Sequence, residues 1–222
     1  MKKITAVIPV RKGSQRVKNK NIKKFHNSNL LKIKIESLKK IDLIHRIIVS
    51  SDCPEMLSIA RELGVDTHHR EAFFASSEAS NSDFFRNLAE SIEGDYLMYS
   101  PVTCPLISRE TIVETINMFE NSDNVITVAP VRHHMWLNNE PLNYKIQESP
   151  NSQDLPDIYM ITYGICLIHR EDMIKYANVV TDNPTFKVLD EIESIDIDTE
   201  FDFMIAEMIY KKINQKREKN ET

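Results

Sequence analysis

The fold is set at the start of the chain by the stretch Ile4-Thr5-Ala6-Val7-Ile8-Pro9-Val10-Arg11-Lys12-Gly13-Ser14-Gln15-Arg16-Val17-Lys18-Asn19-Lys20-Asn21. Its apolar first part, residues 4–10, is typical of a buried strand. Gly13 allows the backbone to come close to a ligand, and Ser14 adds a hydroxyl donor. Five cationic side chains suited to a polyphosphate accompany them: Arg11, Lys12, Arg16, Lys18 and Lys20. The stretch therefore predicts a phosphate-binding loop directly after a first strand.

The distribution of charge supports a local anionic ligand. The first acidic residue of the chain is Glu36, although the whole chain has a formal net charge of -5. A nucleic-acid-binding domain would present a dominant basic face, so we expect no nucleic-acid partner. A solvated, lysine-rich surface loop is the structural alternative for the basic stretch.

Length and composition indicate one α/β domain over residues 1–222, with 41% hydrophobic and 27% charged residues. No apolar run approaches the roughly 20 residues of a membrane span, and the start does not resemble a signal peptide. We therefore expect no membrane association and a cytoplasmic location. The three cysteines lack metal-type spacing and are predicted to be buried free thiols: Cys53, Cys104 and Cys166.

Strand-like and helical segments alternate along the chain, as in a mostly parallel sheet flanked by helices. Strands are predicted at 45–52, 65–68, 95–99, 125–131 and 159–168, and helices at 30–41, 55–63, 82–92, 110–119 and 200–211. Segment 95–99 is expected to be the central strand, and it delivers residues 100–106 to the ligand-binding edge of the sheet. Asp52 and Ser82 are interpreted as helix caps.

The basic loop also resembles a family signature. Its order Arg-x-Gly-Ser-x(5)-Lys-Asn, formed by Arg11, Gly13, Ser14, Lys20 and Asn21, is similar to the CTP-binding loop of the acylneuraminate (sialic acid type) cytidylyltransferases. The resemblance implies a Rossmann-like nucleotidyltransferase domain in which all five residues bind CTP and Arg11 and Lys20 are catalytic. The spacing matches neither the dinucleotide-binding nor the P-loop fingerprint.

A second, partial match to the family follows at Arg70 and the small-residue run 75–80. The resemblance implies that Arg70 and Ser80 bind the base and ribose of CTP. An arginine here can donate to a cytosine carbonyl, and the alternative is a surface Arg70 paired with Glu71 or Glu78.

The acceptor side of the site resembles the family less closely. Segment 100–106 is similar to the family's Gln-Pro-Thr-Ser-Pro-Leu-Arg. Two positions differ, because Pro101 replaces the glutamine and Ile107 replaces the arginine. The resemblance implies that Thr103 binds the acceptor, together with Tyr163 and Gly164, where the family has an Asn-Gly turn. Gly164 is expected to let the acceptor approach the backbone, and a strand glycine beside a bulge is the alternative.

An irregular polar stretch, residues 132–157, is predicted to be a projecting arm. In the resembled family this region forms a dimer contact and helps to close the acceptor pocket, which implies a homodimer and a substrate contact from Gln153. His133 and His134 are adjacent but have no third ligand at metal spacing, so they are not interpreted as a metal site.

Two carboxylates near the end of the chain are predicted to bind magnesium. In an extended segment Asp196 and Asp198 share one face, while Ile195 and Ile197 pack on the other. Mg²⁺ takes oxygen ligands from one or two carboxylates and from substrate phosphates. The family has a similar Asp-Ile-Asp pattern that holds its metal. The alternative is that Asp198 or Thr199 caps the last helix.

These motifs together predict an enzyme that transfers CMP from CTP to a nonulosonic sugar acid and releases pyrophosphate, for surface glycan biosynthesis. Two further acceptors stay open, 3-deoxy-octulosonate and a phosphorylated or phosphonate compound. A CTP-binding protein without turnover is the alternative from a different functional class.

Overall fold

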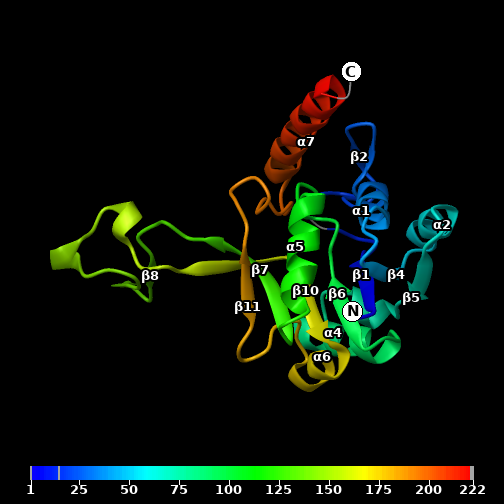
Figure 1. The fold of residues 1–222 in the computed structure, drawn as a ribbon, viewed down its shortest axis with the longest axis horizontal. Coiled ribbons are helices and arrows are strands. Elements are labelled where there is room, and N and C mark those ends of the chain that lie inside the picture. The colour runs from blue at the N-terminus through cyan, green and yellow to red at the C-terminus, as the bar shows by residue number, and fades with distance from the viewer. Residues whose placement is uncertain (1, 15, 221–222) are drawn as a thin grey trace.

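The computed structural model describes residues 2–14 and 16–220, which form an α/β domain around a seven-stranded sheet (Figure 1). Its strands are β1 (Ile4–Pro9), β4 (Ile44–Ser51), β5 (Asp66–His69), β6 (Tyr96–Tyr99), β7 (Asn124–Pro130), β10 (Tyr159–His169) and β11 (Thr185–Val188). Its helices are α1 (Leu30–Lys39), α2 (Pro54–Glu62), α3 (Ala72–Ala75), α4 (Asn81–Ser91), α5 (Arg109–Phe119), α6 (Arg170–Tyr176) and α7 (Glu200–Asn220). The predicted fold class is confirmed.

The sheet order is β11-β7-β10-β6-β1-β4-β5, so the predicted central strand, β6, is in the middle. All neighbouring pairs are parallel except those of β10, which runs antiparallel to β6 and β7. Strand β11 was not predicted, because its Thr-Phe-Lys-Val sequence is too short to stand out. Since β1, β4 and β6 are parallel, the loops that follow them meet at one edge of the sheet.

Two apolar layers hold the helices on the sheet. Within β1, Ile4, Ala6 and Ile8 face the layer that also contains side chains of α1, α2, α5 and α7. Val7 faces the opposite layer, which contains side chains of α4 and α6. Successive side chains of β1 point to opposite faces of the sheet, and both sets are apolar. The helices therefore cover both faces of the sheet.

Residues 132–157 project from the body as the sequence predicts (Figure 1). A hairpin of β8 (Trp136–Leu137) and β9 (Glu140–Pro141) forms part of this arm. Its two-residue turn, Asn138-Asn139, has positive φ at both positions, as a type I′ turn requires. The short 3-10 helices Ile146–Glu148 and Ser152–Asp154 follow. A second small hairpin, β2 (Lys24–Phe25) and β3 (Ser28–Asn29), precedes α1.

Two predicted helix caps are wrong. The N-cap of α4 is Ser80, not Ser82, because Ser80 and Asp83 form a reciprocal capping box. The N-cap of α2 is Cys53, without a side-chain hydrogen bond. Asp52 instead accepts a hydrogen bond from the Lys12 amide, 3.0 Å away, so its carboxylate holds the basic loop.

The three cysteines are buried and free, as predicted.

Gly164 has a packing role that the sequence does not reveal. A Cβ placed there would lie 2.5 Å from the Ile107 Cδ1 atom and 3.4 Å from the Cys104 Cβ atom. The space that was predicted to admit the acceptor is therefore filled by Ile107. Glycine at this position lets β10 pack closely against the segment that follows β6.

We predict that Gly164→Ala lowers the free energy of unfolding by about 1–2 kcal/mol, because the new methyl group must displace Ile107. Ile107→Val removes the Cδ1 atom that causes the clash. The double variant should therefore lose less stability than the sum of the two single variants, measured by urea denaturation. Additive losses would contradict this packing role.

Candidate functional site

A pocket of about 590 Å³ lies where the sheet edge, the basic loop and the C-terminal aspartates meet. The loop after β1 lines one side of it, and residues between β5 and α4 line another. The remaining walls come from the segment after β6, from β10, and from Asp196 and Asp198. The pocket therefore joins the two specific motifs found at opposite ends of the sequence.

Three local features give the basic loop its shape. Gly13 has φ of +86°, in the left-handed region where a side chain would be strained. The Asp52 carboxylate accepts from the Lys12 amide. The Asn21 side-chain amide, which is buried, donates to the Arg11 carbonyl at 3.0 Å. Asn21 was predicted to bind CTP, and in this structure its amide closes the base of the loop.

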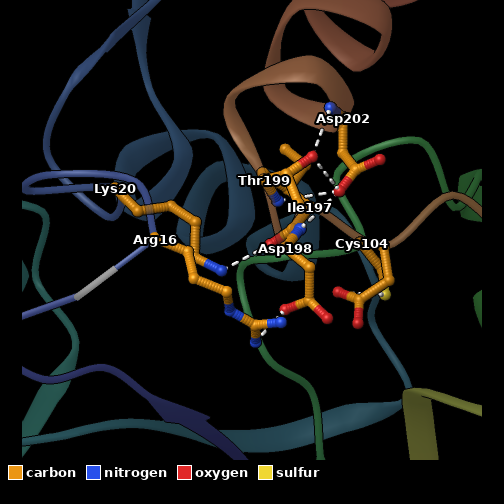
Figure 2. A network of polar contacts seen from close by, with 8 residues as sticks. Arg16, Lys20, Cys104, Ile197, Asp198, Thr199 and Asp202 are labelled. Atoms are coloured by element: carbon orange, nitrogen blue, oxygen red, sulfur yellow. Dashed lines mark hydrogen bonds and ion pairs between the residues drawn. The ribbon is translucent and has the colours of Figure 1, made fainter.

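Most of the cations that line the pocket are held by backbone carbonyl oxygens. The Arg11 guanidinium donates to the Ala75 carbonyl at 2.9 Å and to the Ser76 carbonyl at 3.0 Å. Lys20 donates to the Ile197 carbonyl, as Figure 2 shows. A carbonyl oxygen orients a cation but does not neutralise its charge. The arrangement therefore leaves positive charge available to an anionic ligand.

Arg70 is a buried member of this group, with 3% of its surface exposed. Its guanidinium donates to the Val10 carbonyl at 2.6 Å and lies 5.0 Å from the centre of the Phe84 ring. Its Nε finds no acceptor within the described residues. Burial lowers the pKa of Arg70 to about 10, although Asp52 opposes the shift. The alternative of a surface arginine paired with Glu71 or Glu78 is wrong.

The aspartate pair lies on an extended segment fixed from both sides. Ile197 is fully buried, and its amide donates to the Thr103 carbonyl at 2.9 Å. Asp196 and Asp198, on either side of it, both line the pocket. One Asp198 oxygen lies 2.7 Å from the Arg16 guanidinium (Figure 2). The predicted alternation of carboxylates and isoleucines is confirmed.

Thr199 and Asp202, and not the aspartate pair, cap the N-terminus of α7. The Thr199 hydroxyl accepts from the Asp202 amide at 3.2 Å, and Asp202 Oδ2 accepts from the Thr199 and Asp198 amides. The hydrogen bond from the Thr199 side chain lowers the pKa of Asp202. Of the two predicted caps, Thr199 caps the helix and Asp198 does not. The Asp198 carboxylate lines the pocket instead.

Lys20 is a second cation that interacts with this aspartate pair, beside Arg16. Burial lowers its pKa, and the charges of Asp196 and Asp198 partly oppose the shift. Among the side chains of residues 2–14 and 16–216, no set of three or more His, Cys, Asp or Glu residues is arranged to hold a metal. Two carboxylates beside a cationic loop fit Mg²⁺ only if phosphate oxygens supply further ligands.

Tyr163, Phe85, Tyr99 and Phe84 form an aromatic wall of the pocket. Tyr163 has φ of +53°, an uncommon value for a tyrosine, and its ring stacks on Phe85 with centroids 6.5 Å apart. The Phe85 ring also contacts Tyr99 and Phe84 edge-on or tilted. Thr103 and Pro101 border this wall. The sequence suggested Phe84 and Phe85 only as core residues, because helical spacing cannot distinguish a core from a pocket lining.

The pocket brings together most of the predicted site residues. Those that line it are Arg11, Ser14, Lys20, Asn21, Arg70, Ser80, Thr103, Tyr163, Asp196 and Asp198. Both donors of Ser80 are used by Asp83, so its contribution to a ligand is limited in this conformation. Gly13, Gly164 and Gln153 do not line the pocket. Gln153 is exposed on the arm, which extends away from the body (Figure 1).

The fold and pocket define an α/β protein with a basic loop at the edge of its sheet, and a family comparison makes the class specific. Residues 5–178 match the model of the cytidylyltransferase family. The chain belongs to this family, which confirms the resemblance seen in the basic loop.

Within the described residues, no helix is both long enough and apolar enough to cross a membrane.

Similar proteins come from several bacteria. Post-translational flagellin modification protein B of Campylobacter coli is 30% identical, over 96% of this chain and 97% of its own length. CMP-N,N'-diacetyllegionaminic acid synthase of Campylobacter jejuni is 28% identical, over 94% and 95%. CMP:2-keto-3-deoxy-manno-octonic acid synthetase, solved with CTP, has the same fold with a TM-score of 0.68 at 12% identity, over 95% and 99%.

We predict that Asp52→Ala weakens CTP binding by about 3- to 10-fold, because the Lys12 amide loses its acceptor. Asp52→Asn keeps an oxygen acceptor and removes a negative charge, so it should bind CTP at least as well as the wild-type protein. Calorimetric titration measures both affinities, and thermal melting should show little change for either variant. Tighter binding by Asp52→Ala than by Asp52→Asn would contradict the anchoring role.

Proposed function

We propose that this chain is a CTP-dependent cytidylyltransferase that activates a nonulosonic sugar acid, giving a CMP-sugar and pyrophosphate. One observation carries the proposal: cations held by carbonyl oxygens face a pair of aspartates across a single pocket. The phosphates of a nucleoside triphosphate would pair with these cations, and its divalent cation would pair with the two aspartates. The names of the relatives supply the sugar-acid class.

The proposed reaction is an in-line displacement at the α-phosphorus of CTP. The anomeric hydroxyl oxygen of the acceptor forms the new bond to phosphorus and loses its proton to solvent, and the bond to the bridging oxygen of pyrophosphate breaks. Arg11 and Lys20 offset the charge that develops on the phosphoryl oxygens and the leaving group. Ser14, which lines the pocket, holds a phosphate oxygen, and Gly13 gives the loop the positive φ that its turn requires.

The aspartate pair is the proposed Mg²⁺ site. Asp196 and Asp198 supply oxygen ligands, and phosphate oxygens of the nucleotide complete the coordination. When bound, Mg²⁺ supplies positive charge that stabilises the transferring phosphoryl group. Arg16 is paired with Asp198 in this structure and lines the same pocket, so its guanidinium is a further cation available to the nucleotide phosphates.

Arg70 is proposed to bind the cytosine base. Arg70 lines the pocket, and burial of its guanidinium favours a ligand there that accepts a hydrogen bond from it. The cytosine carbonyl is such an acceptor. Ser80 is proposed to border the ribose through its place on the pocket wall.

The acceptor is proposed to lie between Thr103 and the aromatic wall. Pro101 and Tyr163 stand where the resembled family has glutamine and asparagine, so this side is less polar than the resemblance alone implies. Pseudaminic acid and N,N'-diacetyllegionaminic acid are acted on by relatives of this chain, and acids of this class are our first candidates. The product would serve a surface glycan, because another relative modifies flagellin.

Other acceptors receive less support. A phosphorylated or phosphonate acceptor would require cations in addition to those that bind CTP, whereas the described cations that line the pocket come from the basic loop and Arg70, which are all assigned to CTP here. 3-Deoxy-octulosonate is a sugar acid of similar chemistry and is kept as a candidate. A CTP-binding protein without turnover would not require two aspartates beside Lys20.

We further propose that the protein is a cytoplasmic homodimer. The arm exposes large apolar side chains, among them Trp136 (53% exposed), Leu137 (58%) and Ile146 (60%). A second copy of the chain would cover this surface and bring Gln153 of the arm close to the partner's pocket. Size-exclusion chromatography with light scattering measures the assembly directly.

The proposed activity predicts pyrophosphate release that requires CTP, Mg²⁺ and one acceptor from a panel. The panel contains pseudaminic, legionaminic and N-acetylneuraminic acids, 3-deoxy-octulosonate and a phosphonate. Asp198→Ala should lower the rate by about 100-fold or more, because a metal ligand is lost. Asp42→Ala, which removes an exposed carboxylate outside the pocket, should leave it unchanged. Binding of CTP without release for any acceptor would favour the non-catalytic alternative.

A further inference from the structure

Lys34 is a buried lysine that the proposed chemistry does not use. It lies on α1 with 5% of its surface exposed, on a helix whose other buried residues are all apolar. No carboxylate lies within ion-pair distance of it among the side chains of residues 2–14 and 16–216. Burial lowers its pKa to about 8, so the ammonium form is still present at neutral pH.

An unpaired ammonium is among the most costly groups to bury in a protein core. A leucine or methionine at position 34 would fill a similar volume without this cost. A direct ligand contact does not explain the residue, because Lys34 does not line the pocket. The charge is therefore explained by the groups that accept hydrogen bonds from the ammonium.

The ammonium lies beneath both ends of the segment that follows β6. It donates to the Ser100 hydroxyl at 3.4 Å and to the Cys104 carbonyl at 3.3 Å. Residues 101–103, between these two contacts, line the pocket. Lys34 therefore holds a pocket wall from its buried side, through two neutral acceptors.

This wall in turn carries the aspartate segment. The Thr103 carbonyl accepts from the Ile197 amide at 2.9 Å, between Asp196 and Asp198. The Cys104 thiol lies 3.7 Å from Asp196 Oδ1. A continuous set of contacts thus runs from Lys34 through residues 103–104 to both carboxylates.

We propose that Lys34 is a positioning residue that fixes segment 100–104 and, through Thr103, the separation between the aspartate pair and the basic loop. The proposal deepens the function given above and rests on it for the effect on turnover. Its structural part can be tested without any acceptor.

The test compares Lys34→Met with the wild-type protein. Methionine keeps the length of the side chain and removes the charge and the donors. We expect the thermal midpoint to be unchanged or higher, and the affinity for CTP in the absence of Mg²⁺ to stay within about threefold. Pyrophosphate release should fall at least 10-fold in kcat, with several-fold more Mg²⁺ needed for half-maximal rate.

Hydrogen–deuterium exchange supplies the readout that does not depend on turnover. The Ile197 amide and the peptide 100–106 should exchange at least 10-fold faster in Lys34→Met, while the strands keep their protection. Leu38→Met, one turn further along α1 and fully buried, is the matched control and should change neither segment.

Unchanged exchange at Ile197 together with unchanged turnover would overturn the proposal. Lower thermal stability with weaker CTP binding would also overturn it, because Lys34 would then be an ordinary core residue. If the wild-type protein releases no pyrophosphate with any acceptor, the proposed function fails, and the exchange experiment still decides the role of Lys34.

Discussion

The pocket depends on one constraint, that several positive charges must be held close together before any ligand binds. Arg11, Lys20 and Arg70 meet this constraint by donating to backbone carbonyl oxygens. Of the cations described in the pocket lining, Arg16 alone pairs with a carboxylate of the pocket, Asp198. Carboxylate partners would have cancelled the charge that an anionic ligand needs, whereas carbonyl oxygens orient the cations and leave their charge in place.

The fold supplies these carbonyls from distant parts of the chain. The parallel arrangement of β1, β4 and β6 brings the segments after these strands to one edge, where Val10 and Thr103 lie. The C-terminal segment then crosses this edge, and Ile197 uses both of its backbone polar groups there. Its amide donates to Thr103 and its carbonyl accepts from Lys20 (Figure 2). A single buried residue thus joins the basic loop, the segment that follows β6 and the aspartate pair.

Features with a local cause could be predicted from the sequence. The alternation of Asp196, Ile197 and Asp198 and the Gly-Ser loop after an apolar strand are properties of short segments, and the structure confirms them. Features set by contacts between distant segments could not. Asp52 at a strand-to-helix turn was interpreted as a cap, but its partner is the amide of Lys12. The space beside Gly164 was predicted to admit the acceptor, but Ile107 occupies it. The position of Gln153 outside the pocket also depends on the direction of the arm.

The central claim is that the pocket cations are oriented for a triphosphate. Calorimetric titration with cytidine, CMP and CTP at two salt concentrations tests it most directly. We predict that affinity rises at least 10-fold at each step from cytidine to CTP, and that the affinity for CTP falls as salt is raised, because charge–charge attraction is screened. Equal affinities for the three ligands, or an affinity for CTP that does not change with salt, would contradict the account.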